Sequence, residues 1–289
     1  MNEQAKIAVI GGSGLYEMDN LSDVREVRVQ TPFGDPSDAL VLGTLSGVRC
    51  AFLPRHGRGH VLTPSEINGR ANIWALKSLG VERIIAVGAV GSLKESIVPR
   101  DFVFPDQLVD ETKGRHSSFF GEGVVAHVAF AQPFCEDGNA VLHDEARALG
   151  VRCHRGGVYC CMEGPQFSTK AESAMHRMLG YSVIGMTAVP EAKLAREAEI
   201  CYSLAALITD YDCWKEGEEV SADAVVQTLK ANIANARSLV ERAVRPLASL
   251  PRRCPCARAL EGAVLTSPGK ASPAALKRLE LILGKRAVA

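Results

Sequence analysis

VRCAFLPRHG (48–57), SEINGRANIWALKSLG (65–80) and VERIIAVGAVGSL (81–93) are the stretches that decide the fold. The first and third are short apolar runs stopped by Pro, Gly or a charge, which is typical of buried strands. The middle stretch has apolar residues at helical spacing, with Ser65 as the expected N-cap and Gly80 as the stop. A strand, a helix and a strand in succession predict parallel pairing of the two strands.

The same alternation continues on both sides of this unit. AKIAVIGGSGLYE (5–17) is an expected strand that runs into a glycine-rich turn, and the stretch 110–132 lacks periodicity, as a long functional loop does. We therefore predict an α/β fold: a single domain over residues 1–250, with a central mixed, largely parallel twisted β-sheet flanked by helices. Further helices are expected at 139–150, 169–180, 191–200 and 222–247, and further strands at 156–165, 182–190 and before Asp210.

Composition excludes several classes of function. The 289 residues are 47% hydrophobic and carry 33 Lys plus Arg against 33 Asp plus Glu, so no net charge favours nucleic acid or an anionic membrane as a partner. The first residues lack the pattern of a signal peptide, and no run approaches the roughly 20 apolar residues of a membrane span. We expect a cytoplasmic protein whose nine cysteines are reduced.

Residues 251–289 differ in character and are interpreted as a C-terminal extension of unknown role. PRRCPCARAL (251–260) is rich in Pro and Arg, and the tail ends in SPAALKRLELILGKRAVA, an expected short helix. Cys254 and Cys256 could form a redox pair or half of a metal site. We expect plain thiols on a flexible extension, because the short spacing strains a disulfide and too few partner ligands lie nearby.

LITDYDCW (207–214) places Asp210 and Asp212 directly after an apolar run. Alternate residues of an extended segment project to the same side, so the two carboxylates are expected to face one pocket while Tyr211 points away. The competing interpretation is an acidic pair at a turn or a helix cap.

GGSGL (11–15) follows the first expected strand and offers backbone N–H groups and the Ser13 hydroxyl to an anion. A dinucleotide-binding turn would need glycine at position 17, where this chain has Glu17. A simple tight turn remains the alternative.

LPRHGRGH (53–60) concentrates basic side chains after a strand, where Arg55 can bind phosphate oxygens bidentately and His56 can donate a further hydrogen bond. VGAVGS (87–92) and GMTAVP (185–190) end two more strands with small residues and a Thr hydroxyl. A solvated basic loop is the alternative for the first segment, but four loops that each offer anion donors favour a phosphate site.

Together, IGGSGLYE, TPFGDPSDAL, PRHGRGHVLTPSEINGRANIWALKSLG, GAVGSL, AQPFC, EGPQFSTKAES, MTAVPEAKLAREAEICY and TDYDCWKE resemble the methylthioadenosine-cleaving members of the trimeric purine nucleoside phosphorylase family. The resemblance runs in order from Lys6 to about Leu247. It implies the nucleoside phosphorylase fold and phosphorolysis of 5'-methylthioadenosine to adenine and 5-methylthioribose 1-phosphate. Inorganic phosphate is then a co-substrate, with no cofactor and no metal ion.

The resemblance also implies two sets of binding residues. Relatives often have Thr at the position of Gly88, so one hydroxyl contact to phosphate is absent here and backbone N–H groups remain. Phosphate binding falls on Ser13, Arg55, His56, Gly88, Ala89 and Thr187, and nucleoside binding falls on Phe167, Met186, Ile184, His127, Ala222, Val225 and Val226.

Three of these nucleoside contacts differ in kind. Phe167 corresponds to the residue that packs on the purine, although a single Phe could equally belong to the core. His127 corresponds to a histidine that reaches the 5' end of the nucleoside in a neighbouring subunit, which implies a homotrimer. Ala222, Val225 and Val226 correspond to an apolar wall beside the methylthio group, after a loop that is one residue shorter here.

The carboxylates have a chemical role in this interpretation. Burial would raise the pKa of Asp210, so that its carboxylic acid could protonate or hydrogen-bond N7 of the departing purine. Asp210 or Asp212 could accept the 6-amino group of adenine, whereas the O6 of a 6-oxopurine would face acceptors. Relatives that prefer 6-oxopurines have Asn at the first position.

Three other functions remain open at this point. One is phosphorolysis of methylthioinosine or other 6-oxopurine nucleosides, and one is hydrolysis of a nucleoside by water. The third is non-catalytic nucleotide binding, which would predict loss of Asp210 or of the Arg-His pair; both are present.

Overall fold

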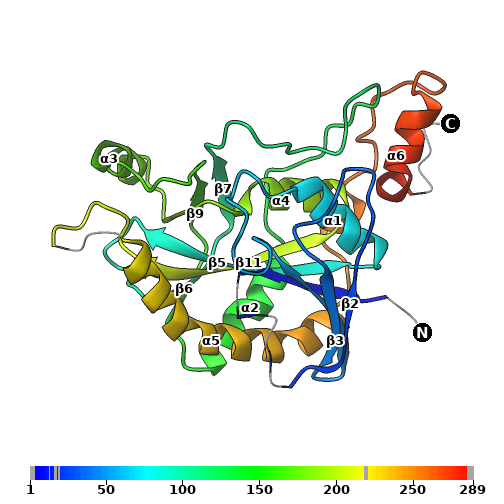
Figure 1. Ribbon diagram of the computed structural model, residues 1–289. Coiled ribbons are helices and arrows are strands. Elements are labelled where there is room, and N and C mark those ends of the chain that lie inside the picture. The colour runs from blue at the N-terminus through cyan, green and yellow to red at the C-terminus, as the bar shows by residue number, and fades with distance from the viewer. Residues whose placement is uncertain (1–3, 13, 16–17, 19, 218–220, 285–289) are drawn as a thin grey trace.

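The computed structural model describes residues 4–12, 14–15, 18, 20–217 and 221–284. Its centre is one mixed sheet of eleven strands. Along the main path the strand order is β2, β3, β4, β1, β5, β10, β9 and β7. A branch leaves this path at β5, where β11 pairs with β5 and β6, and β6 pairs with β8. Figure 1 shows this sheet crossing the middle of the molecule. The strands are β1 (Ile7–Gly11), β2 (Ser22–Val27), β3 (Leu40–Leu45), β4 (Val48–Pro54), β5 (Arg83–Ser92), β6 (Phe102–Phe104), β7 (Gln107–Asp110), β8 (Cys153–Arg155), β9 (Val158–Cys161), β10 (Val183–Gly185) and β11 (Cys201–Asp210).

The central strands are parallel, as the sequence predicts. β1 lies between β4 and β5 and is parallel to both, and β11 runs parallel to β5 along almost its whole length. Antiparallel pairs occur at β2–β3, β3–β4, β5–β10 and β6–β11. The prediction of a mixed, largely parallel sheet is therefore confirmed.

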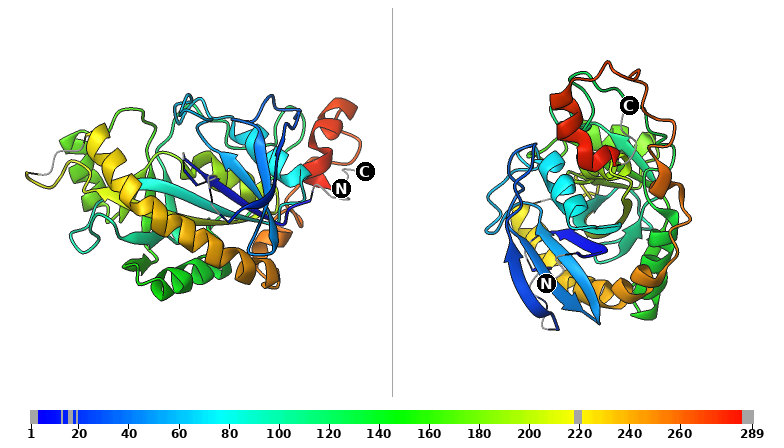
Figure 2. Two further views of the ribbon diagram at one scale, coloured as in Figure 1. Left: turned by 60° about the horizontal axis from the view of Figure 1, so that its bottom comes forward. Right: turned by 90° about the vertical axis from the view of Figure 1, so that its right-hand side faces the viewer.

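Helices cover both faces of the sheet (Figures 1 and 2). In β1, Ile7 and Val9 pack into the cluster with α5 and α2, whereas Ala8 and Ile10 pack into the cluster with α1, α4 and α6. This alternation follows from the pleat of a strand buried on both sides. The helices are α1 (Gly69–Ser78), α2 (Glu136–Ala148), α3 (Lys170–Met178), α4 (Ala188–Glu197), α5 (Ala222–Ser249), η1 (Pro255–Arg258) and α6 (Pro273–Leu283).

The N-cap expected for α1 was wrong. Asn68 caps the helix, and its side chain accepts a hydrogen bond from the Ala71 backbone N–H. The hydroxyl of Ser65 instead donates to the Glu163 carboxylate. Sequence spacing alone favoured Ser65, but Asn68 sits one residue before the first helical turn and has an equally good capping side chain.

The C-terminal extension packs against the rest of the chain. Leu260, Leu279 and Ile282 are buried in the same apolar cluster as Ile73 and Leu76 of α1. The expected short helix near the C-terminus is α6. Composition changes at residue 250, whereas the packing is continuous across it. Among the described helices, none combines the length and apolar character that a bilayer span requires.

Candidate active site

A cavity of about 690 Å³ opens where β4, β5, β10 and β11 end beside the first half of α5. Strand ends of an α/β sheet are the usual place for ligands, because the loops that follow them converge there. Residues that line the cavity include Gly12, Leu15, Arg55, His56, Gly88, Ala89, Gly91, Met162, Phe167, Ile184, Met186, Thr187, Thr209, Asp210, Asp212, Val225, Val226, Leu229, Lys230 and Ile233.

Asp210 and Asp212 both reach this cavity, but not by simple strand alternation. β11 has a bulge between Ile208 and Asp210, and Asp212 lies beyond the strand with a φ of 52°. The Asp212 N–H donates to Asp210 Oδ1 at 2.8 Å, which folds the segment back on itself. Gly91 makes this approach possible, because an added Cβ would lie 2.8 Å from Asp210 Oδ1.

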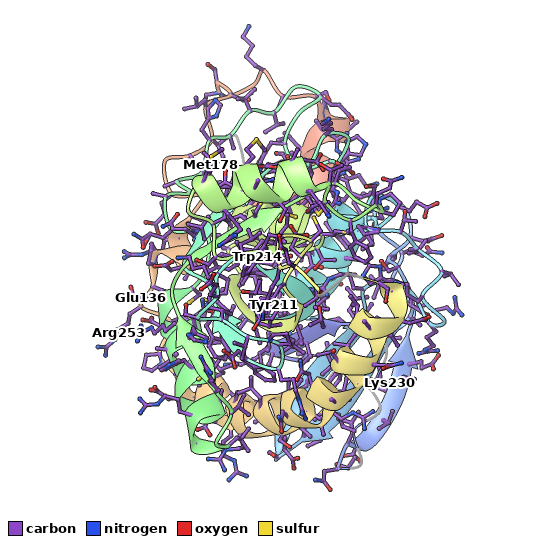
Figure 3. All side chains as sticks on the ribbon, turned by 90° about the vertical axis from the view of Figure 1, so that its left-hand side faces the viewer. Glu136, Met178, Tyr211, Trp214, Lys230 and Arg253 are labelled. Atoms are coloured by element: carbon purple, nitrogen blue, oxygen red, sulfur yellow. The ribbon has the colours of Figure 1, made fainter. Side chains whose placement is uncertain are left out.

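Tyr211 does point elsewhere. Its ring packs edge-on against Trp214, with centroids 5.5 Å apart, and it is absent from the cavity lining in the described residues. Figure 3 looks at the end of the molecule where these two rings lie and also labels Lys230 on α5.

Burial raises the pKa of Asp210. Hydrogen bonds from Thr209 and from the Asp212 N–H oppose this effect, and the neighbouring Asp212 carboxylate adds to it. Asp212 is 4% exposed, and its Oδ2 is buried without a hydrogen-bond partner in the described residues. The pair thus combines a carboxyl whose pKa is raised by burial with an unused acceptor oxygen.

Arg55 is held by a buried carboxylate rather than left free. Its Nε and Nη2 donate to Glu191, and its Nη1 donates to the Val87 carbonyl at 2.8 Å. Both side chains of the ion pair are 2% exposed. Burial alone would lower the pKa of Arg55. The Glu191 carboxylate nevertheless holds this pKa above its usual value. Two of the five guanidinium N–H groups remain for a ligand, so the expected bidentate fork is partly occupied.

His56 sits beside Arg55 in a neutral form. Burial, followed by the charge of Arg55, lowers the pKa of His56 to about 4. Its Nδ1 lies 2.9 Å from the Leu62 carbonyl, so Nδ1 carries the proton and Nε2 is the free ring nitrogen. A ligand therefore meets an acceptor at Nε2 unless it brings a proton or raises this pKa.

The other expected phosphate contacts gather around the same point. Gly88 and Thr187 face each other, because a Cβ on Gly88 would lie 3.3 Å from Thr187 Oγ1. Ala89 lies beside them in the cavity lining, and Thr187 directly precedes α4. Ser13 lies outside the described residues, whereas its neighbour Gly12 lines the cavity.

The expected nucleoside contacts divide into two groups. Phe167, Ile184 and Met186 line the cavity, and the Phe167 ring is 44% exposed, which excludes the core interpretation. Val225 and Val226 also line it from α5, whereas Ala222 at the helix start does not. The apolar face that lines the cavity runs from Val225 to Ile233, whereas Ala222, the first residue of α5, is exposed one turn before it.

His127 is exposed and does not line the cavity of its own chain. It lies in the loop after β7, where its N–H donates to the Ala263 carbonyl and the adjacent Ala126 bridges to Val264. The C-terminal extension therefore supports the loop that carries His127.

Sequence reasoning did not single out several residues of this site. Glu191 was not recognised because it lies 136 residues from Arg55. Thr209 was overlooked although it adjoins Asp210, and its Oγ1 donates to Asp210 Oδ2 at 2.7 Å. Lys230 carried no signal beyond its place in an amphipathic helix.

Comparison with known proteins places this geometry in a family. Residues 6–245 match the model of the phosphorylase superfamily. The chain is 56% identical to the S-methyl-5'-thioadenosine phosphorylase of Geobacter sulfurreducens, over 96% of this chain and 98% of that protein. It is 55% identical to the protein of the same name from Koribacter versatilis, over 98% and 97%.

Solved structures agree. A methylthioadenosine phosphorylase from an antarctic soil metagenomic library superposes with a TM-score of 0.94 at 49% identity, covering 97% of this chain and 99% of that chain. A mutant of the adenosine/methylthioadenosine phosphorylase of Schistosoma mansoni, in complex with methylthioadenosine, gives a TM-score of 0.80 at 38% identity over 86% and 93%. The chain therefore belongs to the S-methyl-5'-thioadenosine phosphorylase family of the phosphorylase superfamily.

Proposed function

We propose that this protein is a pentosyltransferase that cleaves 5'-methylthioadenosine with inorganic phosphate, giving adenine and 5-methylthioribose 1-phosphate in purine and methionine salvage. One observation carries the proposal. A single cavity joins a carboxyl of raised pKa, Asp210, to loops that offer anion donors through Arg55 and Thr187. The names of the relatives at 55–56% identity support the same substrate.

The chemistry follows from the charges that develop as the N-glycosidic bond breaks. Positive charge grows on the ribose and electron density moves onto the purine. Asp210 in its protonated form gives a hydrogen bond or a proton to N7, which makes the base a better leaving group. The bound phosphate stands on the other side of the ribose, where it attacks the anomeric carbon and stabilises the cationic sugar.

The phosphate end of the cavity is built to hold an anion firmly. Glu191 fixes the plane of the Arg55 guanidinium, so the two remaining N–H groups are oriented before phosphate arrives. Because neutral His56 presents Nε2 as an acceptor, we propose that it pairs with the proton of a monoprotonated phosphate or with a proton taken up on binding. Backbone N–H groups at Gly88 and Ala89 complete the set.

The base end favours a 6-amino purine. Asp212 Oδ2 is a buried acceptor without a partner in the described residues, and the N6 amino group of adenine is a donor that can satisfy it. The O6 of hypoxanthine would leave that acceptor unpaired, at a cost of roughly 1–3 kcal/mol, or about 5- to 150-fold in preference. This observation argues against the 6-oxopurine alternative.

We propose a homotrimer in which His127 completes the site of the adjacent subunit. In support, His127 is exposed and away from its own cavity, and the exposed apolar side chains Val125 and Leu265 flank it. We also place the enzyme in the cytoplasm, where its nine unpaired cysteines would stay reduced. No cofactor is needed for the proposed reaction.

The test measures base release by the purified protein from methylthioadenosine and from methylthioinosine, each with and without phosphate. Adenine release that requires phosphate, with at least fivefold lower turnover of methylthioinosine, is the expected result. Turnover without phosphate would instead support a hydrolase, and a preference for methylthioinosine would overturn the role assigned to Asp212.

A further inference from the structure

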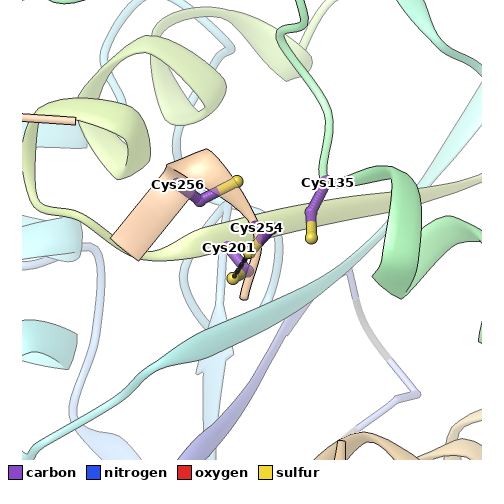
Figure 4. A group of neighbouring side chains, drawn as sticks. All are labelled: Cys135, Cys201, Cys254 and Cys256. Atoms are coloured by element: carbon purple, nitrogen blue, oxygen red, sulfur yellow. Dashed lines mark hydrogen bonds between the residues drawn. The ribbon is translucent and has the colours of Figure 1, made fainter. Parts of the chain in front are cut away.

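Four cysteines meet at the end of the sheet opposite the cavity (Figure 4). Cys135 is the N-cap residue of α2, Cys201 begins β11, and Cys254 and Cys256 flank Pro255 at the start of η1. Cys201 and Asp210 are the two ends of β11, so the cluster lies about 30 Å from the reacting centre at the rise of a strand. The cluster is therefore separate from the active site.

The spacing of the sulfur atoms fits a single tetrahedral metal ion. All four Sγ atoms lie within 4.8 Å of one another, and those of Cys201 and Cys254 are 3.3 Å apart. Zinc with Zn–S bonds of about 2.3 Å holds its four sulfurs about 3.8 Å apart. A disulfide would require a separation of about 2.05 Å, and all nine cysteines of this chain are unpaired.

The surroundings supply what a buried thiolate site needs. The side chains of Cys135, Cys201 and Cys256 are 1%, 1% and 3% exposed. Cys254, the fourth thiol, is half-buried. With three of the four thiols buried, a closed site with four protein ligands is favoured, which is the structural rather than the catalytic type. Four sulfurs at single-ion spacing leave no room for the inorganic core of an iron–sulfur cluster.

Two buried arginines balance the charge of such a site. Arg83 Nη1 lies 3.6 Å from Cys201 Sγ, and Arg196 Nη2 lies 4.0 Å from Cys256 Sγ. Their exposures are 4% and 5%, and within the part of the chain that the structure describes neither forms an ion pair with a carboxylate. Zn²⁺ with four thiolates carries two negative charges, which two guanidinium groups neutralise and orient by N–H···S bonds.

We propose that one Zn²⁺ ion binds the thiolates of Cys135, Cys201, Cys254 and Cys256 and fixes the C-terminal extension to β11 and α2. Binding releases up to four protons and changes no oxidation state. The expectation that too few partner ligands lie near Cys254 and Cys256 was wrong. Folding brings Cys135 and Cys201 beside them.

Metal content is the first test. The protein is purified under reducing conditions without a metal-affinity tag or chelator, and its zinc is measured by mass spectrometry. We expect about one zinc per chain, at least tenfold less in the Cys254→Ser/Cys256→Ser double variant, and an unchanged value in Cys153→Ser. Cys153 is a matched control because it is a half-buried thiol outside the cluster.

A cobalt titration of metal-free wild-type protein keeps the test independent of how the variants fold. We expect the thiolate-to-cobalt charge-transfer bands and the strong ligand-field bands of tetrahedral Co²⁺, both saturating at one equivalent. Less than a tenth of a zinc per chain together with a featureless cobalt spectrum overturns the proposal. A disulfide between any two of the four cysteines in freshly isolated protein, found by non-reducing peptide mapping, overturns it as well.

Discussion

The substitution Asp210→Asn separates proton donation from structure. In the native site Thr209 Oγ1 donates to Asp210 Oδ2 at 2.7 Å, and the Asp212 N–H donates to Oδ1 at 2.8 Å. An Asn side chain keeps the second bond through its carbonyl oxygen. Its NH₂ group replaces Oδ2, and Thr209 can accept from it while donating to the Val90 carbonyl, which already lies 3.2 Å away. The substitution therefore leaves no further buried group unpaired beyond Asp212 Oδ2.

What the variant loses is the acid. General acid catalysis is worth about 10²- to 10⁴-fold, or about 2.7–5.5 kcal/mol, so we expect kcat for methylthioadenosine to fall by that factor at saturating phosphate. The loss should be smaller for methylthioinosine, because the new NH₂ group can donate to O6. The ratio of the two activities should therefore shift by about 5- to 150-fold toward the 6-oxopurine.

The assay follows adenine and hypoxanthine by chromatography, with thermal unfolding as the check of folding. Asp144→Asn makes the same chemical change at an exposed position of α2 and should leave kcat unchanged. An Asp210→Asn protein that is folded and keeps more than a tenth of wild-type kcat would refute the role of Asp210 as the acid.

Further predictions concern the phosphate and base ends of the site. Glu191→Gln leaves Arg55 buried without its counter-ion, so denaturant unfolding should show a loss on the order of 3–5 kcal/mol; a loss below 1 kcal/mol would mean that the pair is not needed. The folded-state pKa of His56, about 4, lies below its unfolded value of about 6.5, so its contribution to stability is present above pH 6.5 and is lost as pH falls toward 4. Urea unfolding at pH 7 and pH 5 should therefore show a smaller drop in His56→Asn than in wild type, by about 1 kcal/mol after allowance for solvent screening; equal drops would contradict the assignment. Phe167→Ala removes an exposed ring from the mouth of the cavity and should raise KM for methylthioadenosine about 5- to 150-fold, because base stacking on an aromatic ring is worth roughly 1–3 kcal/mol, with little change in stability; an unchanged KM would exclude stacking.

The elements that could be predicted from sequence are those whose signal is local. β1, β4, β5 and α1 follow from apolar runs, helical spacing and the glycines between them. The anion-donor loops were visible because each directly follows one of these runs. The convergence of those loops follows from parallel pairing, since the ends of parallel strands share one edge of the sheet.

Interactions between distant segments could not be predicted. The Arg55–Glu191 pair joins residues 136 apart, and no local pattern distinguishes Glu191 from other acids in α4. Asp210 and Asp212 do share a pocket, but strand alternation is not the reason. A bulge in β11 and the left-handed backbone of Asp212 replace the alternation of a regular strand. Only tertiary structure shows that Asp212 Oδ2 is a buried acceptor.

The cysteine cluster and the active site occupy opposite ends of β11, and the C-terminal extension connects them through the His127 loop. Leu265 N–H donates to the Val125 carbonyl, and His127 N–H donates to the Ala263 carbonyl, so the docked extension helps to hold the part of the loop that carries His127. If zinc fixes the extension and His127 serves a neighbouring subunit, removal of zinc should raise KM for the methylthio nucleoside and spare the chemistry at Asp210. A metal-free protein with lowered kcat and unchanged KM would break this link, since the cluster would then act on β11 rather than on the loop.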